Sequence, residues 1–432
     1  MSKKIQYIYI FIFFFSVIFS YFLKIDISNG GASRDLYYHW NYIVALNENL
    51  KVLLEDNNNI KYAYPQHFPL HHIIISRFDY LVFKQENYLN FYFIFSLFLP
   101  IIFYYCLDSR FPEIEFQKKI FISSIIYFIP NFQASAIWGN SHITSLFFFL
   151  ASLYFLINLE KKESEKVNLN IFLVVFFMGC AAYTRQYYVI FFPCLFINIL
   201  RITKLKNIIF FCFCSLMSSI PSLFLIYKNP ALYHGISGNF TDSKSSILIV
   251  LSIVFVYLVP FFISNFKYNF LNYIEILKDK KNLISLFILS IIFSYILLNF
   301  NYNGYLGGGF FYKISIVFIE NNALFFLIAF LGLLLCFYYF KQRIEDIFLI
   351  VIVSSSFSSG YMIFQKYFEP MVIIFMFLLI KKDFVTKIFN FNKHIIFFYF
   401  FFYWLTYYVY SANLITKIHL LLPQIGTVVL SY

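Results

Sequence analysis

The chain has 432 residues, of which 61% are hydrophobic and 12% are charged, and its mean hydropathy is +0.73. An average soluble domain is roughly 25% charged, so this composition excludes a soluble globule and predicts a protein embedded in a lipid bilayer. The formal charge of +12 does not indicate a nucleic-acid partner, because the Lys residues are scattered through short connections between apolar segments and are typical of topological anchors.

Thirteen apolar segments follow one another along the chain, and a helix needs about 20 apolar residues to cross the hydrocarbon core. Lys3 and Lys4 precede the first segment, as in a signal peptide, but it is long and bulky and lacks a small-residue cleavage site. We therefore expect one all-α, polytopic membrane domain over residues 1–432, with about 13 transmembrane helices and an uncleaved first span. The expected spans are 5–23, 89–107, 120–137, 142–159, 168–183, 187–200, 207–227, 246–264, 283–299, 322–340, 346–363, 368–380 and 395–412.

Positive charge distinguishes the two sides of these spans. With the N-terminus in the cytoplasm, 21 of the 33 Lys and Arg residues fall in inner segments, six in short outer loops and six in the long first outer loop. Cytoplasmic loops carry an excess of these residues, so this orientation places the loop 24–88 and the C-terminal tail 413–432 outside. The inner segments are 1–4, 108–119, 160–167, 201–206, 265–282, 341–345 and 381–394.

The first outer loop, 24–88, is the longest polar stretch of the chain. Apolar residues recur at helical spacing over 36–54, which predicts an amphipathic helix on the membrane surface with Asp35 near its N-cap. Pro65 and Pro69 bracket a turn that contains His67, and a second interfacial helix is expected to begin near Pro69. Asp35 is therefore either a helix cap or a carboxylate that does chemistry.

An acidic residue just past the first span, followed by a horizontal helix and a Pro-rich turn, resembles the first outer loop of the GT-C glycosyltransferases. These multi-span enzymes take a sugar from a polyprenyl-phosphate carrier on the non-cytoplasmic face. The resemblance implies that Asp35 is the catalytic base, because an acceptor hydroxyl must lose a proton as it attacks the anomeric carbon.

A second motif, Ala182-Tyr183-Thr184-Arg185-Gln186-Tyr187-Tyr188, lies between two spans at the outer boundary. It closely resembles the Arg-Gln-centred motif of the terminal α-1,2-glucosyltransferases of N-glycan precursor assembly, which are GT-C members that use dolichyl-phosphate glucose. The resemblance implies that Arg185 binds the donor phosphate, for which a guanidinium is a bidentate partner, and that Gln186 orients this group or a sugar hydroxyl. Alternatively, Arg185 only reaches from the bilayer edge into water.

Two later outer loops supply further candidates. Gln365, Lys366 and Glu369 stand together before Pro370, and similar motifs in late outer loops of the family imply that Lys366 is a second phosphate cation while Gln365 and Glu369 help to position the substrate. The alternative is a simple surface ion pair between Lys366 and Glu369. His234, in the loop after the seventh span, is a further candidate for a phosphate or acceptor contact.

No metal or other cofactor is expected. His67, His71 and His72 could suggest a metal site, but hard cations favour oxygen ligands and Asp35 has no adjacent acidic partner. We interpret His67 as a residue that positions substrate, and the other two as structural. The six Cys residues lie inside apolar segments, so neither a disulfide framework nor a zinc spacing is predicted.

The sequence thus predicts an inverting hexosyltransferase of the GT-C type. Its donor would be a polyprenyl-phosphate sugar, and its acceptor would be a lipid-linked glycan or another envelope component. The protein would be embedded in the lipid bilayer. Composition points to a bacterial inner membrane, with undecaprenyl-phosphate donors and a periplasmic active site. Two alternatives remain from other classes, namely a polymerase or ligase of the O-antigen type and a transporter of lipid-linked oligosaccharides.

Overall fold

The computed structural model describes residues 3–28, 31–54, 67–161, 166–229, 243–302, 307–340 and 364–411. Within these ranges the chain is all-α, with helices and no strand. The expected span 346–363, the tail 413–432 and His234 lie outside the described residues.

Eight helical segments of the described chain are long and apolar enough to cross a membrane, which makes this a multi-pass membrane protein. Their positions coincide with eight of the expected spans, while the total of about 13 stays a prediction. They are α1 (Lys3–Leu23), α5 (Gln85–Ser96) continued by α6 (Leu99–Arg110), α9 (His142–Glu160), α10 (Val167–Thr184), α12 (Leu205–Lys228), α14 (Ser243–Ile263), α16 (Lys280–Leu298) and α18 (Ala323–Phe340).

Three other expected spans are helical but do not meet this criterion. The short 3-10 helix η4 (Gln186–Ile190) leads into α11 (Phe191–Ile202), and α20 (Met371–Leu378) has only eight residues. The last, α22 (Lys393–Ser411), has 19 residues but is rich in Tyr, whose hydroxyl groups reduce its hydropathy. Length and composition alone therefore do not establish these three as membrane crossings.

The expected span 120–137 is broken rather than straight. Helix α7 (Phe116–Ser124) and the turn η3 (Ile125–Phe128) end before Pro130, which opens α8 (Pro130–Ile137) at an angle of 67°. Proline lacks a backbone N–H and pushes the preceding residue into the extended region, so the helix cannot continue through it. The break directs the end of α8 towards the turn that contains Asn140.

The outermost helices α12 and α16 expose nearly all of their apolar surface. Only 6% of the most apolar part of α12, and 11% of that of α16, is buried within the chain. Soluble proteins rarely expose an apolar surface of this extent to water. Helices that are hydrophobic on every side are typical of membrane spans. We infer that lipid covers both helices.

Leu216, in the middle of α12, is 64% exposed, and Leu216→Arg is expected to impair insertion of this helix. An Arg at the centre of a spanning helix costs about 2.5–3.5 kcal/mol in insertion free energy. The matched control is Leu205→Arg at the start of the same helix, where the guanidinium reaches the headgroups. Glycosylation mapping of the flanking loops should show loss of insertion for Leu216→Arg alone, and equal insertion of the two variants would contradict a lipid-facing α12.

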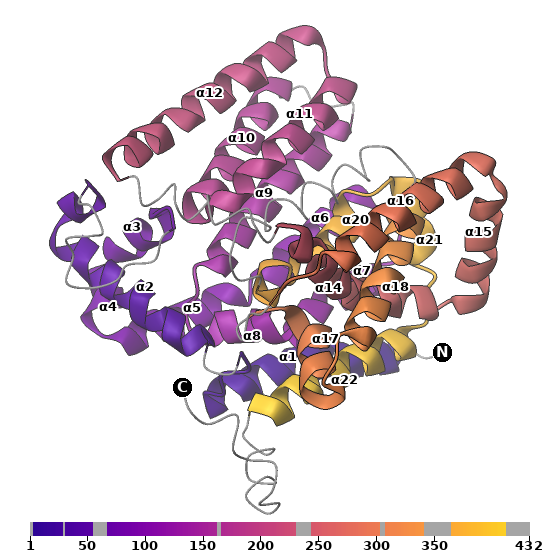
Figure 1. Ribbon diagram of the computed structural model, residues 1–432. Helices are drawn as coiled ribbons and strands as arrows, with labels where there is room; N and C mark the ends of the chain where they lie inside the picture. Colours follow the sequence, from indigo (N-terminus) through magenta and orange to yellow (C-terminus); the bar gives the residue numbers. More distant parts are fainter. Residues whose placement is uncertain are drawn as a thin grey trace, which may run out of the picture.

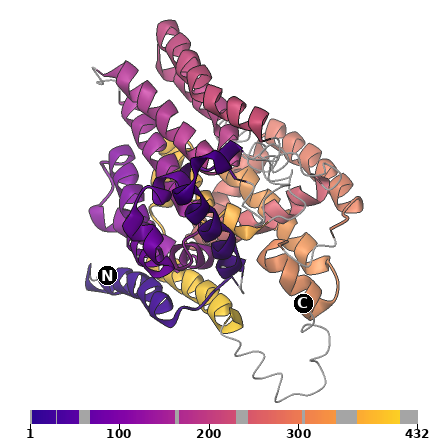
Figure 2. The same cartoon turned by 90° about the vertical axis from the view of Figure 1, so that its left-hand side faces the viewer.

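The elements of the first loop gather at one end of the molecule (Figure 1), which Figure 2 turns towards the viewer. They are α2 (Gly31–Glu48), the turn η1 (Leu50–Leu54), α3 (Leu70–Ser76) and α4 (Asp79–Phe83). The N-terminus, α15 (Phe266–Lys278) and α21 (Lys382–Ile388) lie at the opposite end. Segments predicted to lie on opposite sides of the membrane therefore occupy opposite ends of the folded molecule.

Candidate functional site

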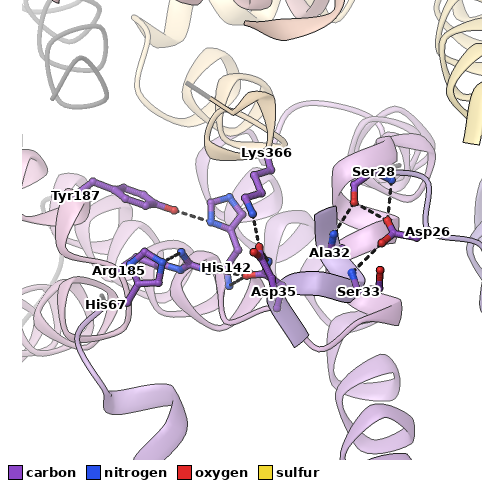
Figure 3. A network of polar contacts seen from close by, with 11 residues as sticks. Asp26, Ser28, Ala32, Ser33, Asp35, His67, His142, Arg185, Tyr187 and Lys366 are labelled. Carbon is purple, nitrogen blue, oxygen red and sulfur yellow. Dashed lines mark hydrogen bonds and ion pairs between the residues drawn. The ribbon is translucent and has the colours of Figure 1, made fainter. Parts of the chain in front are cut away.

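Asp35 does not cap α2, contrary to the position expected from the sequence. The helix begins one turn earlier, at Gly31, and other side chains meet its first amides. Ser28 Oγ accepts from the Ala32 N–H at 2.7 Å, and Asp26 Oδ2 accepts from the Ser33 N–H at 2.8 Å (Figure 3). The carboxylate of Asp35 is therefore available for contacts outside its own helix.

These contacts come from two distant parts of the chain. The Lys366 ammonium forms an ion pair with Asp35 Oδ2, and Asn140 Nδ2 donates to the same oxygen at 3.0 Å. The side chains of Asp35 and Lys366 are 31% and 17% exposed. Lys366 thus pairs with Asp35 rather than with Glu369, and burial of the ammonium lowers the pKa of Lys366 although the carboxylate opposes this shift.

Arg185 is buried more deeply than this ion pair. It follows the last residue of α10 in an extended conformation and is only 2% exposed, so it does not reach into water. Its Nη1 contacts the His67 ring (Figure 3), and its Nη2 donates to Asn140 Oδ1 at 2.6 Å. Gln186 hydrogen-bonds the same ring of His67. In the described part of the chain, no carboxylate forms an ion pair with this guanidinium.

Three candidates that are far apart in sequence therefore converge. Asp35 and Lys366 are in direct contact, and the amide of Asn140 joins Asp35 to Arg185. His67 and Gln186 support the guanidinium from its other side. The described groups of this cluster carry two positive charges and one negative charge, which leaves one positive charge in excess.

Gln365 and Glu369 form a second, buried cluster. Glu369 is 1% exposed, and its carboxylate accepts from the Asn131 side chain at 2.9 Å, from Gln365 at 2.5 Å and from the Tyr403 hydroxyl at 2.9 Å. Gln365 Oε1 also accepts from the Phe310 N–H at 2.8 Å. These contacts hold the turn that carries Lys366, and the role of both residues in positioning substrate stays a prediction.

Asn140 was not among the residues predicted from the sequence. It lies in the turn between α8 and α9, is 0% exposed, and accepts a 2.6 Å hydrogen bond from Tyr92 on its carbonyl oxygen. Gly139 precedes it at φ +63°, where a Cβ atom would lie 2.5 Å from the ring of Tyr88. The polar run Trp138–His142 at a predicted outer boundary was the signal that could have identified this turn.

Four histidines of the first loop pack beside Arg185. His39 Nδ1 and His72 Nε2 are 2.7 Å apart, and His71 lies 2.9 Å from Thr144 Oγ1. Burial, reinforced by the nearby guanidinium, lowers the pKa of His39, His67 and His72 and brings the pKa of His71 to about 3. The described residues contain no group of three or more His, Cys, Asp or Glu side chains placed to hold a metal ion.

These histidines predict an acid-sensitive fold. Their pKa values are lowered in the folded chain and return to about 6.5 on unfolding, so below pH 6.5 the unfolded chain binds more protons. The free energy of unfolding should fall by up to ~1.4 kcal/mol per pH unit and per histidine. Thermal unfolding in detergent at pH 7.5 and 5.5 measures this loss, and His71→Gln should reduce the slope. Equal stability at both pH values would show that folding does not lower the pKa values of these histidines.

Comparisons of the chain with protein-family models, with curated proteins and with solved structures give no significant match.

Proposed function

We propose that the chain is a membrane glycosyltransferase of the GT-C type, which transfers a sugar from a polyprenyl-phosphate donor to a glycolipid or glycan acceptor on the non-cytoplasmic face. The observation that carries this proposal is the buried Arg185, which has no carboxylate partner in the described part of the chain and lies one amide away from Asp35. An uncompensated buried charge is costly, and an anionic ligand would remove that cost.

The charges suit a phosphate leaving group. Lys366 and Arg185 would stabilise the negative charge that develops on the phosphate oxygen as its bond to the sugar breaks. Lys366 is the more exposed of the two and can share its ammonium between Asp35 and an incoming phosphate. Arg185 is held by Asn140 and His67, so it needs little reorganisation when the donor binds.

The chemistry then needs one proton acceptor. The acceptor hydroxyl attacks the anomeric carbon, and its proton passes to Asp35 as the new carbon–oxygen bond forms. The bond between the anomeric carbon and the phosphate oxygen breaks, and polyprenyl phosphate leaves with the bonding electrons. A single displacement of this kind inverts the anomeric centre. The exposed apolar helices support a lipid carrier as donor, since its tail can remain in the bilayer.

The proposal predicts a missing sugar in cells that lack the protein. Mass analysis of envelope glycolipids and glycans would compare cells without the gene with cells complemented by the wild type or by Asp35→Asn. One glycan should lack a single glycosyl unit unless the wild type is present, and Asp35→Asn should fail to restore it. Identical glycans in all three strains would overturn the proposal and would favour a protein that does not transfer sugar.

A further inference from the structure

The turn that carries Asn140 connects the proposed base to the proposed phosphate cation. Its amide nitrogen donates to Asp35 Oδ2 at 3.0 Å, and its amide oxygen accepts from Arg185 Nη2 at 2.6 Å. The same oxygen also accepts from the backbone N–H of His142 at 3.2 Å. Both ends of the amide are therefore occupied.

We infer that Asn140 is a positioning residue that fixes the Asp35 carboxylate and the Arg185 guanidinium relative to each other for sugar transfer; this inference rests on the proposed function. A carboxylate can only accept and a guanidinium can only donate. A side chain that joins them must therefore present a donor to one and an acceptor to the other. An amide does so without adding charge.

The backbone around Asn140 is held from several sides. The Asn140 N–H donates to the Ser135 carbonyl at 3.0 Å, and Tyr92 donates to the Asn140 carbonyl at 2.6 Å. Tyr88 donates to the carbonyl of Gly139. Binding groups are most effective when such supporting contacts fix them in advance.

Asn140→Asp separates positioning from simple structural support. The new carboxylate would lie against Asp35. Two carboxylates at so short a distance share one proton. It would also neutralise Arg185. The charged and titratable groups that face this pair are Lys366 and Tyr367 from the 364–367 turn, Arg185, His67 and His142 around the guanidinium, and Asp26 near Lys366.

The test measures transfer as release of polyprenyl phosphate from undecaprenyl-phosphate hexose, with the full chain in nanodiscs and a membrane lipid extract as acceptor. In Asn140→Asp, the acid limb of the pH–rate profile should move up by about one pH unit. The matched control is Asn269→Asp. The Asn269 amide also uses both ends, donating to Phe262 O at 2.8 Å and accepting from Tyr338 at 3.2 Å, but it lies away from the site.

A second variant covers the case in which Asn140→Asp does not fold. Asn140→Ala removes both contacts without adding charge, and it should weaken binding of undecaprenyl phosphate about tenfold, because the Arg185 guanidinium loses the hydrogen bond that fixes it. Asn269 variants should retain wild-type affinity and the wild-type acid limb. If Asp35→Asn abolishes transfer while both Asn140 variants behave as the wild type, this inference fails alone. If Asp35→Asn transfers normally, the proposed function fails.

Discussion

Asp35→Asn is expected to lower turnover by on the order of 10²–10⁴-fold, the usual contribution of a general base. The amide oxygen can still accept from Lys366 and Asn140, which both contact Asp35 Oδ2 in the wild type, so the variant should insert and fold. It cannot take up the proton of the acceptor hydroxyl. Release of polyprenyl phosphate in nanodiscs, normalised to the amount of folded protein, measures the effect.

Asp79→Asn is the matched control for this variant. Asp79 belongs to the same first loop, and among the described residues its carboxylate accepts from Asn47 at 3.3 Å rather than from a residue of the site. The Asp79→Asn variant should therefore keep the wild-type turnover. Wild-type turnover by Asp35→Asn would eliminate this carboxylate as the base, and an equal loss in both variants would assign the effect to the loop as a whole.

Arg185→Gln is expected to lower turnover by on the order of 10²–10³-fold, which is typical of removing one group that stabilises developing negative charge. Gln can still hydrogen-bond Asn140, but it carries no charge for the phosphate. Arg185→Lys should rescue little activity, because an ammonium cannot reproduce the two fixed donors that hold His67 and Asn140. The same release assay and a titration with undecaprenyl phosphate measure both effects.

Arg110→Gln controls for the loss of a buried guanidinium. Arg110 is 7% exposed and donates to the Ile380 carbonyl at 2.6 Å, away from Asp35. Its replacement should reduce stability while the turnover of the folded fraction stays normal. If Arg110→Gln and Arg185→Gln lowered the turnover of the folded fraction equally, Arg185 would have no special role in transfer.

The sequence predicted that Asp35, Arg185 and Lys366 lie on one side of the membrane. Apolar length and positive charge constrain topology strongly because bilayer thickness and loop charge are simple physical quantities. Segments at the same boundary of a helical bundle can meet whatever their distance in sequence, and these three do so within one cluster. Their convergence supports the prediction of a common site, whereas their roles stay predictions.

Other features depend on local backbone geometry, which the periodicity of apolar residues does not predict. The start of α2 is decided by Asp26 and Ser28, which lie before the apolar repeat, so Asp35 was wrongly placed near the cap. Pro130 breaks the third expected span at 67°, and a hydropathy window averages over such a break. Asn140 lies in the turn that follows this break, where a count of apolar residues gives no weight to a single amide.

Binding of undecaprenyl phosphate to the purified chain in nanodiscs, compared with binding of undecaprenol, tests the central claim most directly. The two lipids share a tail and differ only in the phosphate that Arg185 and Lys366 would hold. We expect the phosphate to bind at least about tenfold more tightly, and we expect Arg185→Gln to abolish this preference. Equal affinity for the two lipids in the wild type would contradict the assignment of a phosphate site to this cluster.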